Sequence, residues 1–398
     1  MGHVSVVEHR AALRRVVGPG RAERLPLDRH AVGRRLTADL IAADDLPRFD
    51  SSAMDGYAAH PAHGGRRVLD VVGDVPAGAA ADFVVRPGQA ARIMTGARVP
   101  EGAVAVVPVE RTDASPTGPP PTTVTVRGDL TPGRHIRRRG EDIASGETVA
   151  PAGTLVDAAL LALARSTGCT VLTAHAPTRV AVIATGAELA GPEHDPAAGE
   201  IHESNSDMIA ALALEAGCLV THVDKCSDDP AELAALFTAL DVAADVDLVI
   251  TTGGVSQGAY EVVRQVGTSF GGFEFVHLAM QPGGPQGTGR LAARTPVVCL
   301  PGTPVGAYVS FAMLLRPALD ERHGNPPRQP GCATYVGAER GTRPGRVQFV
   351  SAILAGDGTV SAAPGHHLRA LTRADALIEV PEQVERLCAG DEVVVHRL

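Results

Sequence analysis

Short apolar runs alternate with amphipathic stretches through the middle of the chain. The apolar runs lie at 179–184, 219–223, 246–251, 275–280 and 296–300. Between them are helix start and stop signals, such as Asp229-Pro230 before 231–240 and Gly217 after 208–214. Buried strands that alternate with helices are typical of a parallel sheet covered on both faces. The pattern therefore predicts a doubly wound α/β domain over residues 177–325.

The regions on either side have shorter apolar runs, which Pro and Gly interrupt. Upstream runs predict a small β domain over 45–140, and downstream runs predict a C-terminal β domain over 326–398. Helical patterns at 7–17, 28–40 and 157–165 predict a linking domain of residues 1–44 and 141–176, into which the small β domain is inserted. The predicted fold class is therefore multidomain α/β plus β, with the doubly wound domain at its centre.

Composition and charge exclude several classes of protein. A chain of 398 residues with 44% hydrophobic and 20% charged residues is typical of several globular units. The net charge of −9 argues against nucleic acid as a main partner, and no apolar run approaches the ~20 residues that cross a bilayer. The N-terminus has no signal-peptide pattern, and the six cysteines are scattered without a Cys-x-x-Cys pair. We therefore expect reduced thiols and a cytoplasmic protein.

One segment, residues 46–58, is unusual for either a core strand or a surface loop. It places two carboxylates, two hydroxyls and a glycine among the bulky side chains of Phe49, Met54 and Tyr57. We interpret it as a polar loop with apolar anchors, which holds the carboxylate of Asp55 in a fixed place.

Three glycine-containing turns follow predicted parallel strands. The carboxyl ends of such strands lie on one rim of an open α/β sheet, where ligands bind. Glycines there let the backbone approach a phosphate or a flat heterocycle. Each turn alone could be ordinary strand-to-helix geometry, but together they favour an anionic ligand of nucleotide or pterin type. The turns are Thr185-Gly186, Thr252-Gly253-Gly254 and Leu300-Pro301-Gly302.

Carboxylates follow the same predicted strands. Glu188, Asp228, Asp229 and Glu261 all lie close in sequence to the rim. Mg²⁺ prefers oxygen ligands and shares them with phosphates, so these acids predict a magnesium site. The alternative for each of them is a helix cap or a solvated loop charge.

Two further polar turns are candidates for ligand contacts. In residues 137–142, three arginines precede Gly140 and two acids that include Asp142, which suits an anion site or an ion-paired junction between domains. A solvated charged face is the alternative. In residues 92–97, Thr95 could donate to a substrate oxygen or could belong to an ordinary turn.

These segments resemble motifs of the molybdopterin molybdenumtransferase family, which includes MoeA and the gephyrin E domain. FDSSAMDGYA (49–58) is similar to the family's FDNSAMDGYA, and RIMTGARVPE (92–101) is similar to its RIMTGAPVPEG. Further matches follow in the same order between about residues 25 and 380, so the chain is identified as a member of this family. They are RRRGEDI (137–143), TGAEL (185–189), SN (204–205), TTGGVSQG (251–258) and LPGTPV (300–305).

The resemblance implies an elongated homodimer with four domains per subunit, and a cleft between the α/β domain of one subunit and β domains of the other. It implies insertion of molybdenum from molybdate into adenylylated molybdopterin, with Mg²⁺ assisting and AMP released. A molybdopterin adenylyltransferase is a candidate partner. The implied catalytic residues are Asp55, Thr95, Asp142 and Glu188, and the implied metal ligands are Glu188, Asp228 and Glu261. The implied ligand-binding residues are Thr185, Gly186, Ser204, Asn205, Gly253, Gly254, Ser256, Pro301 and Gly302.

The chain also departs from the family pattern. Its QPGGP turn (281–285) lacks both lysines of the family's KPGKP, an acid is lost at Ala259, and a frequent basic residue is replaced within 348–351. The lysines would be natural partners for molybdate or phosphate oxygens. Their loss predicts weak molybdate binding unless another cation, such as Arg290 or Arg346, takes their place.

Two other classes of function stay open beside molybdenum insertion. The first is a non-catalytic pterin-binding paralogue that keeps the scaffold without the lysines. The second is a molybdopterin adenylyltransferase, because related α/β domains carry TGG turns. Retention of Asp55, Asp142, Glu188 and Asp228 favours an enzyme over a binding paralogue, and the flanking β domains favour an insertase over an adenylyltransferase.

Overall fold

The chain forms two compact units. The computed structural model describes residues 4–62, 67–191, 195–243, 245–256, 258, 261–292, 295–364 and 368–398. One unit joins Met1–Glu23 to His175–Leu398, and the other is Arg24–Ala174. No helix among the described residues is long and apolar enough to cross a membrane.

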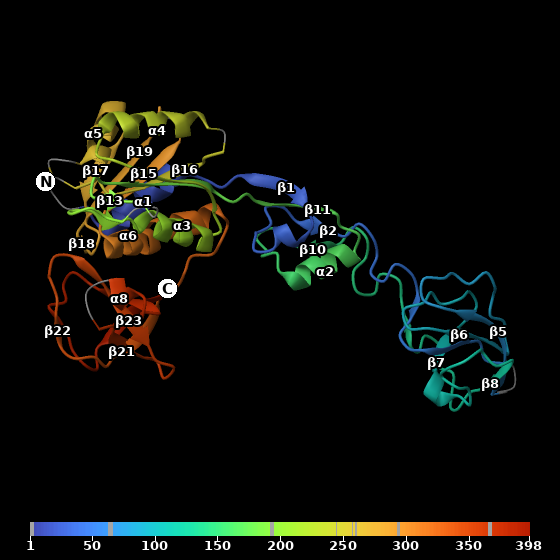
Figure 1. Ribbon diagram of the computed structural model, residues 1–398. Coiled ribbons are helices and arrows are strands. Elements are labelled where there is room, and N and C mark those ends of the chain that lie inside the picture. Colours follow the sequence, from blue (N-terminus) through green and yellow to red (C-terminus); the bar gives the residue numbers. More distant parts are fainter. Residues whose placement is uncertain are drawn as a thin grey trace. The chain divides into compact units, whose positions relative to one another are not determined.

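A six-stranded mixed sheet is the centre of the first unit (Figure 1). Its first four strands are parallel, as the alternation of apolar runs predicts, and its last two are antiparallel to their neighbours. The strand expected at 275–280 forms over Glu274–His277, but it pairs with an antiparallel strand, β19 (Pro285–Arg290), which the sequence analysis missed. In order across the sheet, the strands are β15 (Leu219–Cys226), β12 (Arg179–Thr185), β16 (Leu248–Thr252), β20 (Pro296–Leu300), β19 (Pro285–Arg290) and β17 (Glu274–His277).

Helices cover both faces of this sheet (Figure 1). Alternate residues of one strand enter two different cores: Val180 and Val182 join one cluster, and Ala181 and Ile183 join the other. The strand is therefore buried on both faces, which explains its continuous apolar run. The covering helices are α4 (Pro230–Val242) and α5 (Val262–Phe270) on one face, and α3 (Asn205–Glu215), α6 (Pro304–Ser310) and α7 (Arg316–Arg322) on the other.

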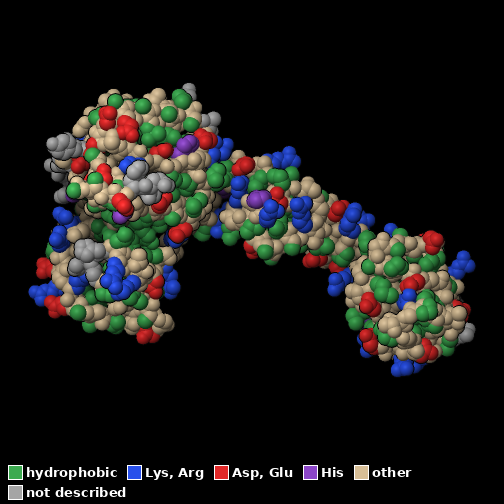
Figure 2. All heavy atoms as spheres, in the orientation of Figure 1, with side chains coloured by type: hydrophobic (Ala, Val, Ile, Leu, Met, Phe, Trp, Pro, Cys, Tyr) green, Lys and Arg blue, Asp and Glu red, His purple; other side chains and the backbone are tan. Residues whose placement is uncertain are grey.

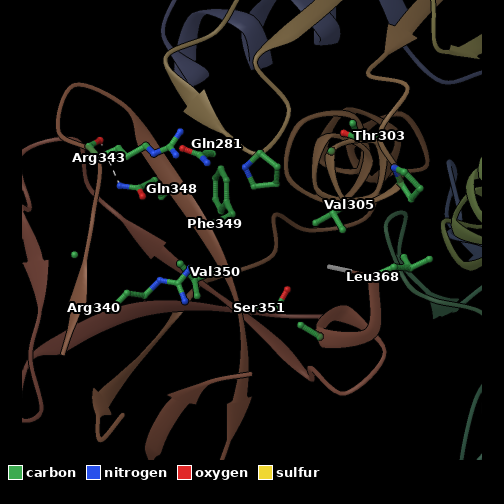
Figure 3. Close-up of a pocket in the computed structure, with 15 residues that line it drawn as sticks. Gln281, Thr303, Val305, Arg340, Arg343, Gln348, Phe349, Val350, Ser351 and Leu368 are labelled. Carbon is green, nitrogen blue, oxygen red and sulfur yellow. Dashed lines mark hydrogen bonds between the residues drawn. The ribbon is translucent and has the colours of Figure 1, made fainter. Parts of the chain in front are cut away.

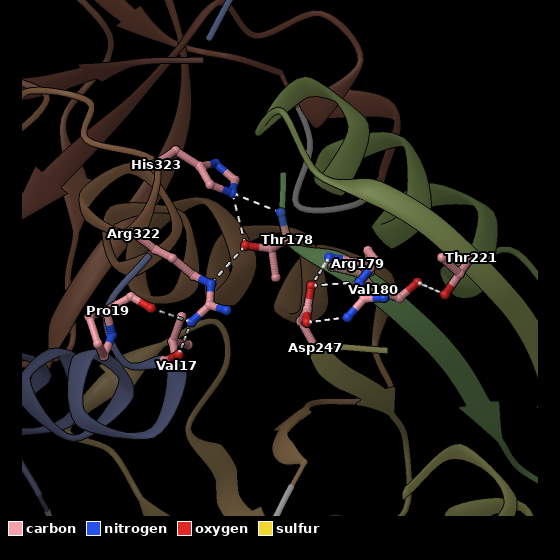
Figure 4. Close-up of polar contacts among 9 residues, drawn as sticks. All are labelled: Val17, Pro19, Thr178, Arg179, Val180, Thr221, Asp247, Arg322 and His323. Carbon is pink, nitrogen blue, oxygen red and sulfur yellow. Dashed lines mark hydrogen bonds and ion pairs between the residues drawn. The ribbon is translucent and has the colours of Figure 1, made fainter. Parts of the chain in front are cut away.

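The first helix, α1 (Val6–Val17), packs on this sheet and not on the linking domain to which the sequence assigned it. Leu13 and Val17 are buried in the cluster that covers one face of the sheet. The helix begins with a capping box between Ser5 and Glu8. At the C-terminal end of α1, the guanidinium of Arg322 donates to the carbonyls of Val17 (2.6 Å) and Pro19 (2.9 Å) (Figure 4).

A buried polar network lies beside that contact (Figure 4). The N–H of Thr178 donates to His323 Nε2 (3.1 Å), so the other ring nitrogen carries the proton that reaches the carbonyl of Ala216 (3.0 Å). Burial lowers the pKa of His323, which keeps the ring neutral. Arg179 and Asp247 form an ion pair of 2.7 Å at the start of β12. Together with the His323 contacts, this ion pair holds the amino-terminal end of the strand, opposite the carboxyl end.

A π-helical turn, Phe311–Leu315, joins α6 to α7. Pro317 has no N–H for the carbonyl four residues before it, which is that of Met313. Arg10 Nε donates to that carbonyl at 2.8 Å, so α1 satisfies the group that the proline leaves without its usual partner.

The C-terminal β domain belongs to the same unit. Its strands run in the order β18-β23-β24-β21-β27-β25, and β25 also pairs with β23, which closes five strands into a ring. Strand β18 (Met280–Gln281) comes from the α/β region and joins the two parts. The other strands are β21 (Gly331–Tyr335), β23 (Val347–Leu354), β24 (Thr359–Ala362), β25 (Ala376–Val380) and β27 (Glu392–Arg397), with the short pair β22 (Arg340–Gly341) and β26 (Arg386–Leu387) and helix α8 (Leu368–Leu371).

The second unit contains a five-stranded sheet and a smaller helical part. The sheet has the order β7-β4-β6-β5-β8 and corresponds to the predicted inserted β domain. Its strands are β4 (Gly56–Ala59), β5 (Val68–Val75), β6 (Gln89–Ile93), β7 (Ala105–Pro108) and β8 (Thr123–Thr125). The smaller part contains α2 (Ala158–Ser166) and the paired strands β2 (Leu40–Ile41) and β10 (Thr148–Ala150). The short pair β3 (Ser51–Ser52) and β9 (Ile136–Arg137) packs with the five-stranded sheet, whose core contains Ile136.

The predicted helix at 28–40 was wrong. Only the 3-10 turn Arg29–Ala31 forms there, with Asp28 as its cap. The apolar side chains Leu36 and Leu40 are buried, but from extended segments and not from one helical face. In a short segment, buried apolar residues at this spacing fit either a helix or an extended chain. The four domain boundaries stay a prediction.

We expect His9 to make the stability of the first unit depend on pH. Its side chain is 3% exposed, and burial lowers its pKa to about 4 from 6.5. Because the unfolded chain binds the proton more readily, the free energy of unfolding should fall as pH drops from 6.5 towards 4, by about 3 kcal/mol. Denaturant unfolding at pH 7 and pH 5 should show about 2 kcal/mol of this loss in the wild type and a smaller loss in His9→Leu, in which His323, whose pKa burial also lowers, still contributes. The exposed His202→Gln should behave like the wild type, and equal losses in all three proteins would contradict the role of His9.

Candidate functional site

The three glycine turns lie at neighbouring strand ends, as predicted. They follow β12, β16 and β20, which are adjacent in the sheet. The turns also touch: a Cβ atom on Gly302 would lie 3.2 Å from the Cα of Gly253, and one on Gly253 would lie 2.4 Å from the carbonyl oxygen of Thr185. Gly253 has φ +94°, a conformation that favours glycine. The glycines therefore let the three turns pack directly against one another, with Gly186 and Gly253 buried and Gly302 exposed at the surface of the rim.

Asn205 ties helix α3 to this rim. Its side-chain amide donates to Thr252 Oγ1 (3.2 Å) and to the carbonyl of Gly302 (2.7 Å). Its Oδ1 atom is buried and has no hydrogen-bond partner among the described residues, and the same holds for Thr185 Oγ1. Buried polar atoms are nearly always paired in native proteins. Two such atoms at one rim therefore favour a bound polar group.

Glu203 was missed by the sequence analysis, although it holds the start of α3 in place. Its carboxylate accepts from the N–H groups of Asn205 (2.6 Å) and Ser206 (3.0 Å) and from the Ser206 hydroxyl. Ser204, which directly precedes the first helical residue and is one of the implied ligand-binding residues, makes no side-chain cap bond and is exposed. An acid two residues before the first helical residue was the available signal, because helix N-termini favour negative charge.

The predicted metal ligands lie near the rim but do not form a ready-made site. Asp228 Oδ2 accepts from the N–H of Ala187 (3.1 Å), and the carboxylate of Glu188 folds over Gly186 in the same turn. Glu261 belongs to the next turn, where its Oε2 accepts from the N–H of Ser256 (2.9 Å). In the described part of the chain, no group of three His, Cys, Asp or Glu side chains is arranged to hold a metal ion. Ala259 lies outside the described residues.

Asp55 and Thr95, which are distant in sequence, meet in the second unit. Pairing of β4 with β6 places Gly56 opposite Ile93 and so brings the two turns together. Asp55 Oδ1 accepts from the backbone N–H of Thr95 (2.6 Å) and from its hydroxyl (2.7 Å). These two bonds, the backbone one first, hold the pKa of the exposed Asp55 carboxyl below its ordinary value. Asp55 is thus an ionised carboxylate at neutral pH, and the Thr95 hydroxyl donates to it.

The three apolar side chains of the loop at residues 46–58 differ in their burial. Tyr57 is buried, at 1% exposure, and its neighbour Gly56 could not carry a Cβ atom, which would lie 1.9 Å from the carbonyl oxygen of Val107. Phe49 and Met54 are each 38% exposed. The prediction of an anchored loop is correct for Tyr57 and wrong for the other two, which leave apolar surface beside Asp55.

The arginine run forms an ion-paired junction. Arg138 pairs with Asp50 (2.6 Å), and Arg139 pairs with Asp45, whose carboxylate also accepts from the N–H of Ser145 (2.8 Å). Two of the three arginines are therefore ion-paired, as the interpretation of the run as an ion-paired junction expects. Asp142 follows the junction as an exposed residue, and its backbone N–H reaches the carbonyl of Leu46 (3.1 Å).

A cavity of about 840 Å³ lies between the α/β sheet and the C-terminal β domain (Figure 3). The QPGGP turn forms part of its wall. Gln286, which is fully buried and was also missed, supports this turn by donating to the carbonyl of Gly283 (2.7 Å) and to Ser310 Oγ (2.7 Å). Figure 2 shows that basic side chains are frequent over the surface of the C-terminal domain.

The sequence and the structure match known proteins along the whole chain. The matching family descriptions are "MoeA N-terminal region (domain I and II)" for residues 4–168, "Probable molybdopterin binding domain" for 181–321, and "MoeA C-terminal region (domain IV)" for 337–398. The chain is 43% identical over 414 aligned positions to molybdopterin molybdenumtransferase 2 of Mycobacterium tuberculosis, covering 99% of each chain. It is 32% identical over 405 positions to molybdopterin molybdenumtransferase 1 of that organism, covering 92% of each.

A solved structure confirms the predicted multidomain fold. The crystal structure of the molybdopterin biosynthesis MoeA protein from Pyrococcus horikosii superimposes with a TM-score of 0.82 at 26% identity, covering 100% of this chain and 99% of that one. The mixed α/β and β architecture is therefore shared over the full length.

A single methyl group on the rim should reduce ligand binding. Gly302 is exposed and has no positive φ, so Gly302→Ala should fold, but its Cβ would stand 3.2 Å from Gly253. We expect at least about tenfold weaker binding of adenylylated molybdopterin, because the methyl group would push the Gly302 turn away from the Gly253 turn and so change the shape of the rim. Fluorescence titration would measure it, with Gly356→Ala as the matched control, since nothing lies within 4 Å of a Cβ there. Unchanged binding in Gly302→Ala would contradict the placement of the ligand on this rim.

Proposed function

Because the chain belongs to the MoeA family of molybdopterin molybdenumtransferases, we propose that it inserts molybdenum from molybdate into adenylylated molybdopterin. In this reaction, water adds across the phosphoanhydride bond and AMP leaves. The observation that carries the proposal is the rim of three touching glycine turns, where two buried oxygen atoms, on Thr185 and Asn205, have no hydrogen-bond partner among the described residues. Such a rim suits the phosphates and flat rings of this substrate.

Mg²⁺ would fit beside the turn that holds Glu188 and Asp228. Both are oxygen donors, and Mg²⁺ in phosphate-handling sites commonly takes one or two carboxylates and completes its shell with phosphates and water. A preformed group of three ligands is therefore not needed. When bound, the ion would offset the negative charge of the phosphates, while Asp228 keeps the turn closed through the N–H of Ala187. Glu261 fits less well as a ligand because its carboxylate already holds the neighbouring turn.

The proposed active site combines the rim with Asp55 and Thr95 from two subunits of a homodimer. The support is the family resemblance, which implies a cleft built from both subunits. In this site the ionised Asp55 would orient the Thr95 turn towards the ligand, and Asp142 would add a second carboxylate from the same unit. The six free thiols suit a cytoplasmic protein, and a molybdopterin adenylyltransferase is the class of enzyme that would supply the substrate.

A substrate test separates this function from its two rivals. An insertase releases AMP from adenylylated molybdopterin when molybdate and Mg²⁺ are present. An adenylyltransferase instead releases pyrophosphate from ATP and molybdopterin, and a binding paralogue releases neither product. Chromatography of the nucleotides after incubation with each substrate pair would distinguish the three, and pyrophosphate formation would contradict the proposal.

A further inference from the structure

We infer that Arg340 and Arg343 carry the oxyanion contacts for which the QPGGP turn lacks lysines. This inference rests on the proposed function, since it concerns how the chain holds molybdate. Both arginines line the cavity in which that turn lies. Positive charge is thus retained in the site, but it comes from the segment around β22 and not from the turn.

The chemistry of the cavity wall favours an anion. Among its described lining residues, two are arginines and none is an acid. Hydroxyl and amide groups from Thr303, Gln348 and Ser351 complete the polar part of the wall, and the buried ring of Phe349 lies among them. A tetrahedral oxyanion needs both charge and several hydrogen-bond donors, and this wall offers both.

The two guanidinium groups reach the cavity from β22 and from the residues that directly follow it. Figure 3 shows the Arg343 side chain extending towards Gln281, and the Arg340 side chain lying beside Val350. The amide of Gln348 donates to the backbone carbonyl of Arg343 at 3.4 Å and so ties the Arg343 segment to β23. A guanidinium presents its donors in a planar fork that matches two oxygens of one anion.

The other candidate cations are not placed for this role. Arg290, one of the two suggested by the sequence, donates to the carbonyl of Val16 (2.9 Å) at the end of α1. Arg346, the other, is not among the residues that line the cavity. A lysine restored at Gly284 would require the His277 side chain to move, because a Cβ there would lie 2.7 Å from His277 Nε2. The structure therefore corrects both suggested replacements.

Calorimetric titration of the full chain with sodium molybdate tests the inference directly. We expect Arg340→Gln and Arg343→Gln each to weaken binding about tenfold or more, and the double variant to weaken it further. Arg346→Gln is the matched control, three residues from Arg343 and outside the lining, and should bind like the wild type. Because Arg343 extends towards Gln281, adding Gln281→Lys to the Arg343→Gln variant should recover most of the lost affinity.

Wild-type affinity in the double variant would overturn the inference, and so would an equal loss in Arg346→Gln or the absence of saturable binding by the wild type. Thermal unfolding and binding of adenylylated molybdopterin, measured on the same variants, should be unchanged. These measurements also distinguish failure of the inference about the arginines from failure of the proposed function. If the wild type releases AMP in a molybdate-dependent way and the double variant binds molybdate normally, the inference fails and the proposed function stands. If molybdate binds through the arginines but AMP is never released, the proposed function fails.

Discussion

Replacing Asp55 with alanine should reduce molybdenum insertion on the order of 100-fold while the protein stays folded. Asp55 accepts both the N–H and the hydroxyl of Thr95, so its removal frees the turn that it positions and deletes a negative charge. Misplacement of a group by about 1 Å can cost that much in rate. Molybdate-dependent AMP release under saturating substrate would measure the loss.

Asp113 offers a matched control in the same unit. Its carboxylate accepts from the N–H of Thr125 (2.7 Å), and its pKa is also lowered, first by that bond and then by the Thr125 hydroxyl. Asp113→Ala should therefore lose a similar local contact but keep its turnover. Asp55→Asn keeps an acceptor for Thr95 without the charge. We expect it to restore the turn but not the rate, and near-normal turnover in folded Asp55→Ala would show that the carboxylate has no part in the reaction.

Mixed dimers should recover activity that neither parent variant has. If each site takes Asp55 from one subunit and Glu188 from the other, a dimer of one Asp55→Ala and one Glu188→Ala chain has one complete site. Random association then gives about a quarter of wild-type turnover, because half of the dimers are mixed and each of these has one of two sites intact.

The controls for this experiment are the unmixed variants and a mixture of two preparations of Asp55→Ala, all of which should stay inactive. No recovery after verified subunit exchange would show that both residues act within one chain. A monomer at micromolar concentration by light scattering would contradict the dimer itself.

The α/β region was predictable because its physical signals are strong and local. Strand β12 is buried on both faces, so its apolar run is unbroken, and Asp229 caps α4 as expected, accepting from the N–H of Ala231 (2.8 Å). Strand β19 was missed because its sequence, PQGTGR, contains no apolar run. Its glycines are required by contact: a Cβ on Gly289 would lie 2.4 Å from the ring of Phe273. Only the tertiary structure reveals that need.

The separate motifs of the candidate site were predictable from the sequence, but the contacts between their residues were not. The strand alternation was enough to place the three glycine turns on one rim. The bond between Asp55 and Thr95 depends on the register of β4 against β6, which no local pattern specifies. The cavity arginines were missed for a similar reason, because Arg340 and Arg343 lie about 60 residues beyond the turn whose charge they are inferred to replace. Long-range contacts of this kind follow from packing and not from spacing.

The most direct test of molybdenum insertion measures two products in one reaction. Purified protein is incubated with adenylylated molybdopterin, Mg²⁺ and molybdate, and the AMP released is compared with the molybdenum retained on the pterin after removal of free molybdate. The account predicts that the two rise together, one for one, that neither forms when molybdate or Mg²⁺ is omitted, and that both fall on the order of 100-fold when Asp55→Ala replaces the wild type. Release of AMP without retained molybdenum, or no release at all, would contradict it.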